Sequence, residues 1–326
     1  MIYIIVLNWN GFEDTLNCLM SLTKMKHKDY AIIVCDNGST DDSIKKIIHW
    51  GESLIERCND EFNFIYSKIK KTEEVHLNLQ KKNIVLFDIG KNLGYAAGNN
   101  IGLNYAIKQD NCEAVWILNN DTEVDENALS EIIKYRHIKG DGIYGSKLVY
   151  FHDKKTIQGL GGLVNKYLCT TSHYMEGENI DIKIDNEKIS DNIDYIIGAS
   201  FFITNKVLRD IGEFSEDYFL YFEEIDYCIR AKNKGYNIFP VSGSVVYHKE
   251  GASTKKDSKG ILSDYLSIKN RLLVSKKFYR KYFYIVYLSL IGVLLNRLIR
   301  HEMIKAKNIA LLIFGKDVYP IDKLMK

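Results

Sequence analysis

Residues 1–41 read MIYIIVLNWNGFEDTLNCLMSLTKMKHKDYAIIVCDNGSTD, and this stretch decides the fold. It contains two short apolar runs, Ile2 to Leu7 and Ala31 to Cys35, and each ends at a polar side chain, Asn8 or Asp36. Short runs rich in Ile and Val that do not alternate with polar residues are typical of strands covered on both faces. The stretch therefore predicts two buried strands, joined by a segment long enough for a helix.

The same pattern continues to about residue 125. Two further runs, Ile84 to Phe87 and Ala114 to Leu118, end in polar clusters in the same way. Amphipathic helical patterns follow the first two strands, and Ser39 is the predicted N-cap of the second helix. Strands that alternate with helices predict a parallel sheet. The apolar helical positions are Phe12, Leu16, Leu19 and Met20 in the first helix and Ile44, Ile47 and Ile48 in the second.

Four polar clusters follow the four predicted strands. Ligands of open α/β sheets bind beyond the carboxyl ends of the strands, so clusters at that edge predict a nucleotide site. Each cluster taken alone is read more simply as a turn or a helix cap, because Asn, Asp and Gly favour turns. The clusters are Asn8-Trp9-Asn10, Asp36-Asn37-Gly38-Ser39, residues 88–92 and Asn119-Asn120-Asp121.

Two long polar stretches interrupt this pattern. Residues 51–82 mix both signs of charge and predict a solvated excursion between the second and third strands. Residues 152–190 are similar but contain Gly159, Gly161 and Gly162, which predict a mobile loop over the site.

Charge is divided unevenly along the 326 residues. Residues 1–250 carry 28 basic and 37 acidic side chains, a net charge of −9, whereas residues 251–326 carry 16 and 5, a net charge of +11. A hydrophobic content of 46% disfavours disorder, and an acidic body disfavours nucleic acid as a partner. The basic end predicts contact with an anionic surface.

The cysteines and the first residues indicate a reducing compartment. None of the six cysteines stands in a C-x-x-C pair, which predicts free thiols and no structural zinc. Residues 1–7 lack a basic leader and a small-residue cleavage site, so we expect a buried strand there and not a signal peptide.

Seven motifs stand in order along residues 1 to about 254. They are VLNWN (6–10), CDNGSTD (35–41), NLGYAAGNN (92–100), LNND (118–121), GAS (198–200), FLYFEEID (219–226) and YHKEGAST (247–254). The ordered set resembles glycosyltransferase family 2, in particular its rhamnosyltransferase-like branch. The resemblance implies the GT-A fold, a Rossmann-like and mostly parallel sheet flanked by helices. Gly94 and Gly98 lack the G-x-G-x-x-G spacing, which disfavours a dehydrogenase.

The resemblance implies donor-binding roles at the strand ends. It places the carboxylate of Asp36 on the ring N–H of a uracil or thymine, and a turn carboxylate is the alternative. Small residues at Gly198 and Ala199 predict a floor beneath a sugar ring, a feature that packing alone explains equally well. The expected donor-binding set is Asn8, Asn10, Asp36, Asn37, Ser39, Asn92, Gly94, Asn119, Gly198 and Ala199.

A divalent cation is expected beside the donor. Transfer from a nucleoside diphosphate needs the leaving diphosphate neutralised, which a hard cation on oxygen ligands does well. The family usually has D-x-D here, and this chain has Asn119 in place of the first Asp. We expect Asp121 to bind Mn²⁺ or Mg²⁺ directly, with the carbonyl oxygen of Asn119 in a weakened site. The resemblance makes His248 a second ligand or a diphosphate contact, and a structural histidine is the alternative.

Inverting transfer needs a carboxylate that takes the proton of the acceptor hydroxyl. The family often has Glu-Asp where this chain has Glu223-Glu224, so Glu224 is the expected base, displaced by one extra methylene. Asp226 is expected to be structural, because it can pair with Arg230 one helical turn later.

The C-terminal segment combines basic residues with an apolar run. Tyr282 to Leu295 is 14 residues long, about 21 Å as a helix, and the hydrocarbon core of a bilayer is about 30 Å thick. No apolar run reaches the 18 residues expected of a spanning helix. Basic flanks predict a membrane-surface element, and a helix packed on the catalytic body or on another subunit is the alternative.

These expectations combine into one function with two alternatives. We expect a metal-dependent inverting hexosyltransferase that takes a UDP- or dTDP-linked sugar, rhamnose or another hexose, to a glycan or lipid-linked acceptor in surface polysaccharide synthesis. It would be cytoplasmic, peripheral on the inner face of the cell membrane. The alternatives are a sugar nucleotidyltransferase and a decayed glycan-binding or scaffold subunit. The expected regions are a nucleotide-binding half (1–125), an acceptor and catalytic half (126–254) and a basic helical region (255–326).

Overall fold

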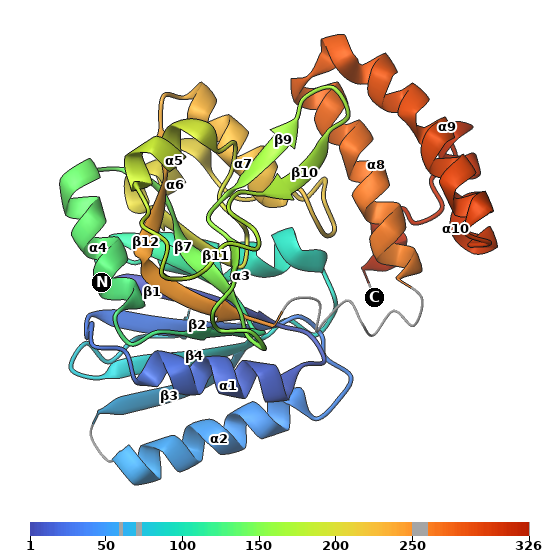
Figure 1. Ribbon diagram of the computed structural model, residues 1–326. Helices are drawn as coiled ribbons and strands as arrows, with labels where there is room; N and C mark the ends of the chain where they lie inside the picture. Colours follow the sequence, from blue (N-terminus) through green and yellow to red (C-terminus); the bar gives the residue numbers. More distant parts are fainter. Residues whose placement is uncertain (59–60, 70–73, 250–259, 326) are drawn as a thin grey trace.

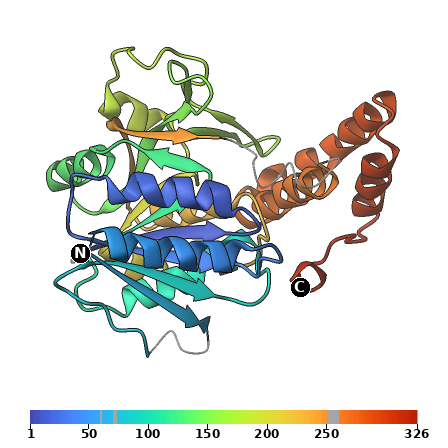
Figure 2. The same ribbon diagram turned by 90° about the horizontal axis from the view of Figure 1, so that it is seen from below.

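The computed structural model describes residues 1–58, 61–69, 74–249 and 260–325. Over these residues the body is a ten-stranded mixed sheet with helices on both faces, and helices α8 to α10 stand to one side of it (Figures 1 and 2). The expected boundary between residues 254 and 255 lies outside the described residues. This architecture matches the α/β fold class predicted from the sequence.

The four predicted strands form the parallel centre of the sheet. They are β1 (Ile2–Asn8), β2 (Tyr30–Asp36), β4 (Lys82–Asp88) and β5 (Ala114–Asn119). Strand β1 pairs in parallel with β2 and β5, and β2 pairs in parallel with β4. The predicted parallel sheet is therefore confirmed, and the carboxyl ends of these strands share one edge.

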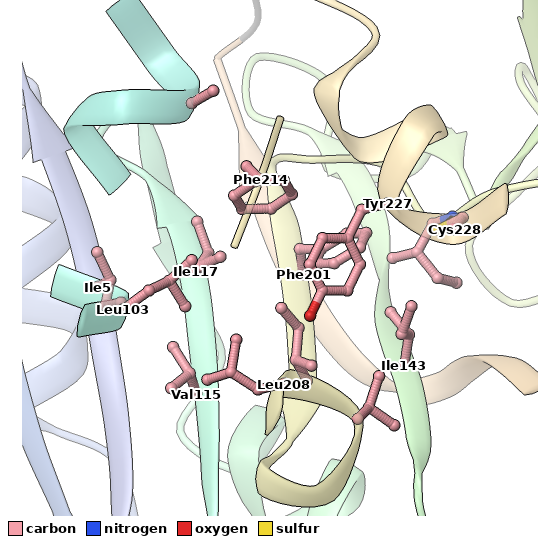
Figure 3. Close-up of a cluster of buried hydrophobic side chains, with 14 of the residues drawn as sticks. Ile5, Leu103, Val115, Ile117, Ile143, Phe201, Leu208, Phe214, Tyr227 and Cys228 are labelled. Carbon is pink, nitrogen blue, oxygen red and sulfur yellow. Dashed lines mark hydrogen bonds between the residues drawn. The ribbon is translucent and has the colours of Figure 1, made fainter. Parts of the chain in front are cut away.

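Both faces of this centre are covered, which explains the unbroken apolar runs. On one face Ile4 packs in a cluster with residues of α1 (Phe12–Thr23), α2 (Ser43–Cys58) and α4 (Ala128–Lys139). On the other face Ile5 belongs to a cluster with residues of α3 (Gly94–Ile107), which Figure 3 shows around Leu103 and Ile117. In α1 one apolar assignment is wrong: Met20 is 41% exposed. The buried positions of that helix are Thr15, Cys18, Leu19 and Leu22.

The expected solvated excursion over residues 51–82 is wrong in part. It contains the end of α2 and an edge strand, β3 (Phe62–Lys68), which pairs in parallel with β4. Only Phe62 of β3 is buried, although Phe64, Ile65 and Tyr66 follow it in the strand. The residues Phe62 to Tyr66 could therefore have indicated a strand, and the charged residues on both sides of them obscured it.

The expected mobile loop over residues 152–190 is also wrong. It contains three short strands, β8 (Ile157–Gly159), β9 (Gly162–Asn165) and β10 (Thr170–His173), and helix α5 (Asn186–Asn192). Its glycines serve close packing: a Cβ on Gly162 would lie 2.2 Å from the ring of Tyr195. A Cβ on Gly161, whose φ is +88°, would lie 2.6 Å from Ile193. These contacts pack the segment closely against residues 193–195.

The second half of the sheet brings new strands to the same edge. Strand β11 (Ser200–Thr204) runs antiparallel between β5 and β7 (Gly142–Tyr150), and β12 (Asn237–His248) pairs in parallel with β7. The short β6 (Thr122–Val124) pairs antiparallel with β12, so that His248 lies opposite Thr122. Helices α6 (Asn205–Ile211) and α7 (Glu223–Asn233) cover the face that carries α3.

The C-terminal region is helical, as expected. It consists of α8 (Ile261–Phe278), the 3₁₀ turn η3 (Arg280–Tyr282), α9 (Phe283–Ile299), α10 (Met303–Ile313) and α11 (Ile321–Leu324). The length expectation is wrong, because the residues flanking the apolar run extend the helix. Among the described residues one helical stretch, Arg280–Ile299, is long and apolar enough to cross a membrane by length and composition, and 11% of its most apolar window is buried.

Candidate active site

The ends of β1 and β2 are joined through a buried carboxylate. Asp36 is fully buried, and its Oδ2 accepts hydrogen bonds from Asn8 Nδ2 and Ser39 Oγ, both at 2.7 Å. Its Oδ1 accepts a third from the Ser39 backbone N–H at 2.9 Å. Burial raises the pKa of Asp36, and these hydrogen bonds oppose that shift. Asp36 is therefore held as a structured acceptor at the strand edge.

The expected helix cap at Ser39 is wrong. Its hydroxyl is engaged with Asp36 and with the backbone N–H of Asn10, and the N–H of Ser43, the first residue of α2, bonds to Asp41 Oδ1 at 3.0 Å. Ser39 instead belongs to the strand-end cluster, the other role expected for it. Ser and Asp both favour the N-terminal positions of helices, so their sequence pattern alone does not distinguish Ser39 from Asp41 as the residue that caps α2.

The remaining loops of this edge are tied to one another. Asn37 Nδ2 donates to Asn92 Oδ1 and to the Gly94 carbonyl, both at 3.0 Å. Asn10 Oδ1 accepts from the Thr40 N–H at 2.7 Å. The expected meeting of the polar clusters is confirmed for these residues, whereas their contact with a donor remains a prediction.

Gly94 brings α3 against a distant turn. Its φ is +83°, and a Cβ there would lie 2.5 Å from the Phe219 carbonyl oxygen, which accepts the N–H of Tyr95 at 2.7 Å. A side chain at position 94 would push this turn away. Gly94 thus positions the segment that leads into α7, and so links the carboxyl-end edge of the sheet to Glu223 and Glu224.

Asp121 and His248 meet at the candidate metal position. His248 Nε2 lies 3.2 Å from Asp121 Oδ1, and both residues are buried. On the other side of the ring, Nδ1 lies 2.9 Å from Gln158 Oε1. An Nδ1–H donated to this oxygen leaves the Nε2 lone pair facing the carboxylate, the tautomer that a metal-binding histidine needs.

This pair fits a divalent cation. Neighbouring ligands about 2.1 Å from an octahedral centre lie about 3 Å apart, close to the observed separation. No cluster of three or more His, Cys, Asp or Glu that could hold a metal occurs among the described residues, so phosphate oxygens or water would complete the shell. Asn119 Oδ1, the third expected ligand, lies 3.0 Å from the Tyr95 hydroxyl.

Glu223 and Glu224 begin α7 beside these residues. A Cβ on Gly198 would lie 3.8 Å from the Glu224 carboxyl carbon and 3.7 Å from the Tyr95 hydroxyl. Burial raises the pKa of Glu224 to about 7. Burial and the nearby charge of Glu224 raise the pKa of Glu223 further above its usual range, and Glu223 Oε2 has no hydrogen-bond partner. The two carboxyls therefore titrate as a coupled pair, in which burial favours the neutral form of Glu223.

The turn before this pair is strained and held by the C-terminal region. Tyr221 and Phe222 have φ values of +72° and +74°, a conformation that costs bulky side chains about 1–3 kcal/mol each. Asn270 of α8 donates to the carbonyl oxygens of Leu220 and Tyr221 at 2.9 and 2.8 Å. These two hydrogen bonds from α8 therefore hold in place the turn from which α7 begins.

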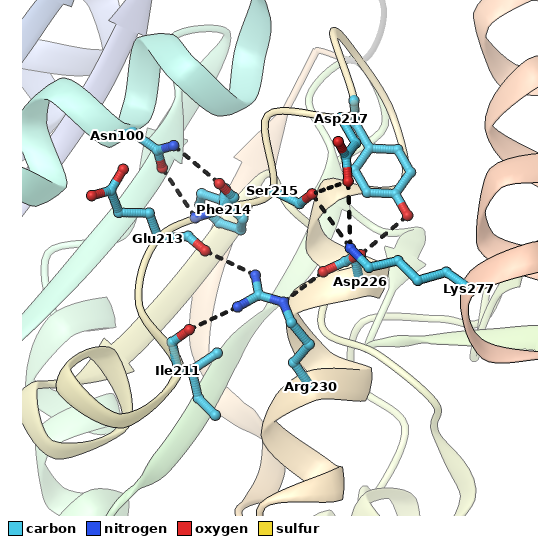
Figure 4. Close-up of polar contacts among 10 residues, drawn as sticks. Asn100, Ile211, Glu213, Phe214, Ser215, Asp217, Asp226, Arg230 and Lys277 are labelled. Carbon is cyan, nitrogen blue, oxygen red and sulfur yellow. Dashed lines mark hydrogen bonds and ion pairs between the residues drawn. The ribbon is translucent and has the colours of Figure 1, made fainter.

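Asp226 forms a second connection to α8. It is fully buried and pairs with Arg230 Nε at 2.6 Å, as expected from the sequence, and with Lys277 Nζ at 2.5 Å (Figure 4). Arg230 also donates to the carbonyls of Ile211 and Glu213. This network joins α6, α7 and α8, which supports the structural role expected for Asp226.

Three residues of the site escaped sequence analysis. Tyr95 stands inside a recognised motif and could have been found there, since its hydroxyl also lies 3.1 Å from the Gly198 carbonyl. Gln158 lies in a segment interpreted as a loop, and Asn270 in one interpreted as a tail, and neither carries a local sequence signal. Their roles depend on contacts across about 50 to 90 residues of chain.

Comparison with known proteins adds sequence relatives that are glycosyltransferases. No family model matches the chain. The chain is 23% identical over 258 residues to the low-salt glycan biosynthesis hexosyltransferase Agl10 of Haloferax volcanii, covering 78% of this chain and 77% of that protein. It is 20% identical over 198 residues to the galactofuranosyltransferase GlfT2 of Mycobacterium tuberculosis, covering 56% of this chain and 30% of that protein.

Solved structures show the same fold. The mannosyltransferase PcManGT from Pyrobaculum calidifontis, in complex with GDP-Man and Mn²⁺, matches with a TM-score of 0.53 and 13% identity over 89% of this chain and 70% of that one. GalNAc-T7 with UDP, GalNAc and Mn²⁺ matches with a TM-score of 0.52 and 12% identity over 76% of this chain and 43% of that one. The fold of this chain is GT-A.

Proposed function

We propose that this chain is an inverting, metal-dependent hexosyltransferase. It would move rhamnose or another hexose from a UDP- or dTDP-linked donor to a hydroxyl of a glycan or lipid-linked acceptor in surface polysaccharide synthesis. The observation that carries the proposal is the placement of Glu224, with its pKa near neutrality, on the same sheet edge as Asp36 and the Asp121–His248 pair. Two sequence relatives, the hexosyltransferase Agl10 and the galactofuranosyltransferase GlfT2, support it.

The donor would bind across the ends of β1, β2 and β5. A carboxylate offers about four lone-pair directions, and Asp36 uses three of them within the protein, which leaves one for a pyrimidine ring N–H. Asp121 and His248 would hold Mn²⁺ or Mg²⁺, which neutralises the charge of the leaving diphosphate when bound. Residues 1–125 thus serve the donor in this proposal.

The acceptor would be activated by Glu224. A partly exposed carboxylate with a pKa of about 7 is available as a base at neutral pH and strong enough to take the hydroxyl proton as the oxygen attacks the anomeric carbon. Gly198 leaves room beside this carboxylate for a sugar ring. Residues 126–254 contribute these groups.

The region 255–326 would keep the enzyme on the inner face of the cell membrane, on the cytoplasmic side. Helix α9 packs against α8 and α10 through Leu290, whereas Leu288 and Leu295 on its other side are more than half exposed. Arg297 of α9 forms an ion pair with Asp264 of α8, which ties α9 to a polar neighbour. A helix covered by protein on one side and apolar on the other favours a surface position over a spanning one.

A nucleotide-sugar panel tests the proposed function. Purified protein is incubated with UDP-, dTDP- and GDP-linked hexoses, with Mn²⁺, Mg²⁺ or a chelator, and nucleoside diphosphate release is measured. We expect metal-dependent release from a UDP- or dTDP-linked donor. Release of diphosphate from a nucleoside triphosphate and a sugar phosphate would instead indicate a nucleotidyltransferase, and no turnover of any donor would indicate a decayed subunit.

A further inference from the structure

A cavity of about 580 Å³ lies between the turn before α7 and the C-terminal helices. Its volume is within the range of about 300–1,000 Å³ that is typical of small-molecule sites. Phe222 of that turn forms one side, and Arg271 of α8 and Arg297 of α9 form others. Among the described residues, none of those expected to bind the donor or the metal lines it. The cavity is therefore distinct from the proposed donor site.

Arg271 brings to this cavity a buried charge without a carboxylate partner. The residue is 9% exposed, and its Nε and Nη2 donate to the Leu168 carbonyl at 3.0 and 2.8 Å. Nη2 also donates to Ser289 Oγ at 3.2 Å. Among the described residues no carboxylate lies within ion-pair distance of Arg271, and its Nη1 has no hydrogen-bond partner. Because a buried cation without an anion is costly, the cavity favours an anionic ligand.

Two further cations line the cavity and share their carboxylates. Arg297 pairs with Asp264 of α8 and with Glu302, and Lys305 of α10 also pairs with Glu302. Arg300, at the end of α9, lies 4.0 Å from the same Glu302 carboxylate. Positive charge around the cavity therefore exceeds negative charge after these ion pairs are counted, which adds to the attraction for an anion.

One carboxylate in the lining favours a ligand with a single charge. Asp264 lines the cavity beside Arg297. A phosphate monoester carries about 1.5–2 negative charges at pH 7, so this carboxylate would repel it more strongly than it would repel another carboxylate. Guanidinium groups bind carboxylates as readily as phosphates. The charges of the lining therefore favour a carboxylate as the anionic group.

Hydroxyl groups line much of the remaining surface of the cavity. A hydroxyl can donate one hydrogen bond and accept two, so it suits a ligand that is itself rich in hydroxyls. Among the described residues, Ser263 and Ser267 have no side-chain hydrogen bond within the protein. A carboxylate and several hydroxyls together describe an acidic sugar. The lining residues with hydroxyls are Thr170, Thr171, Tyr221, Ser263 and Ser267.

The cavity adjoins the proposed base. Phe222 lines it and precedes Glu224 by two residues, a stretch of chain that spans at most about 7 Å. Tyr195 interacts with both sides: burial raises the pKa of its hydroxyl, the charge of Glu224 raises it further, and a side-chain interaction with Thr171 lowers it. A sugar held in the cavity therefore lies beside the place where Glu224 would take the proton of the acceptor.

We propose that this cavity binds the carboxylate of an acidic sugar that belongs to the glycan acceptor. The inference deepens the proposed function and rests on it, since it gives the acceptor a carboxylate next to its reacting hydroxyl. The carboxylate would accept hydrogen bonds from Arg271, and the sugar hydroxyls would meet Ser263 and Ser267. A neutral glycan would leave Arg271 without an anion, and a small carboxylic acid would leave the hydroxyls of the lining without partners.

Titration of the full chain with hexuronates tests this inference. Glucuronate, galacturonate and mannuronate are each compared with the neutral hexose, with acetate and with glucose 6-phosphate. Binding is followed by nuclear magnetic resonance with a chelator present, so that a metal at Asp121 and His248 does not hold the carboxylate. We expect at least one uronate to bind at least tenfold more tightly than its hexose, acetate and glucose 6-phosphate.

Three results of this titration would overturn the proposal. The first is the absence of any preference for a uronate over its hexose. The second is equal affinity for acetate, which would indicate a carboxylate site that does not recognise a sugar. The third is tighter binding of glucose 6-phosphate than of every uronate, which would indicate a phosphate site.

Two variants locate the binding. Ser263→Phe fills the cavity and removes no hydrogen bond that the structure shows, and Arg271→Gln removes the buried charge. Each is expected to weaken binding of the preferred uronate at least tenfold, whereas Lys276→Gln, at an exposed cation on the same helix outside the cavity, is expected to leave it unchanged. Unchanged affinity in Ser263→Phe overturns the proposal, even if Arg271→Gln fails to fold.

Donor turnover by wild-type protein, measured in parallel, separates this inference from the proposed function. Donor turnover without a preference for any uronate refutes the acidic acceptor alone. A preference for a uronate in protein that turns over no donor refutes the proposed function, and with it the acceptor role of the cavity. Displacement of the uronate by saturating UDP or dTDP would place it in the donor site and overturn the proposal.

Discussion

The two sides of the site are built in opposite ways. On the proposed donor side, Asp36 is buried, and every hydrogen bond to its carboxylate comes from Asn8 or Ser39. On the acceptor side, Glu223 keeps a buried oxygen without a hydrogen-bond partner, behind a turn with two residues in left-handed conformation. The first side has its buried carboxylate hydrogen-bonded by nearby residues, whereas the second contains a strained backbone turn and a buried carboxyl oxygen without a partner.

The contacts that stabilise the strained turn come from the C-terminal helices. The donor edge needs only the sheet, whereas the acceptor turn depends on Asn270 and Lys277, about 50 residues further along the chain. A structure that keeps strain and an unpartnered carboxyl at one place does so because surrounding contacts hold it there. We infer that the C-terminal helices help to position the proposed catalytic residues, in addition to the membrane contact proposed for them.

The largest expected effect comes from Glu224→Gln. Loss of a general base lowers turnover by about 10²–10⁴-fold, and donor affinity is expected to stay within about twofold. Steady-state transfer and donor titration measure the two quantities. Glu223→Gln is the matched control: the amide keeps the size of the buried carboxyl and breaks no hydrogen bond of Oε2, so its turnover is expected to remain within a few fold. Equal losses in both variants would remove Glu224 from the base role.

The pH profile of transfer gives the next largest effect. Burial holds the pKa of Glu224 at about 7, and a base acts only when unprotonated. Below pH 7 the rate is therefore expected to fall about tenfold for each pH unit, and above it to level off. The pH at which the rate falls is expected to stay the same in Glu223→Gln, because burial, and not a charge on Glu223, raises the pKa of Glu224. A rate that is flat between pH 5 and 8 would contradict this assignment.

Asn270→Ala tests whether the hydrogen bonds of Asn270 hold the strained turn in position. It removes both hydrogen bonds to the Leu220 and Tyr221 carbonyls, and a displacement of about 1 Å at the reacting groups costs up to about 10²-fold in rate. We expect kcat to fall about 10- to 100-fold with unchanged donor affinity. Asn308→Ala is the control, since Asn308 is equally buried in α10 but its amide nitrogen has no partner. A loss of donor affinity in Asn270→Ala, with kcat preserved, would refute a positioning role.

Asp36→Asn is expected to have the smallest of these effects and to act on the donor side alone. Losing a hydrogen bond to a charged acceptor costs about 1.5–3 kcal/mol, so donor affinity is expected to fall about tenfold or more, with kcat at saturating donor little changed. Asp110→Asn makes the same change at an exposed position after the C-terminal end of α3, away from the strand ends, and is expected to leave affinity unaltered. Indistinguishable affinities in the two variants would exclude Asp36 from the donor site.

The same contrast explains what the sequence could predict. The parallel strands, the convergence of their polar ends and the pairing of Asp226 with Arg230 follow from local patterns and short spacings. Local patterns do not predict the strands within residues 152–190 or the hydrogen bonds of Asn270, and charged neighbours obscure the edge strand β3. The first two depend on contacts with distant residues. The sequence predicts Ser39 as a helix cap, whereas its hydroxyl contacts Asp36, because helix caps and contacts at strand ends use the same residue types.

The central claim is that a pyrimidine nucleotide and a divalent cation bind at the carboxyl ends of the strands, beside Glu224 as the general base. Calorimetric titration with UDP and with dTDP tests this claim most directly. With Mn²⁺ present, we expect wild-type protein and Glu224→Gln to bind one of these nucleotides with similar affinity, and Asp121→Ala to bind it at least tenfold more weakly. Absence of binding of either nucleotide to wild-type protein, with both Mn²⁺ and Mg²⁺, would contradict the claim.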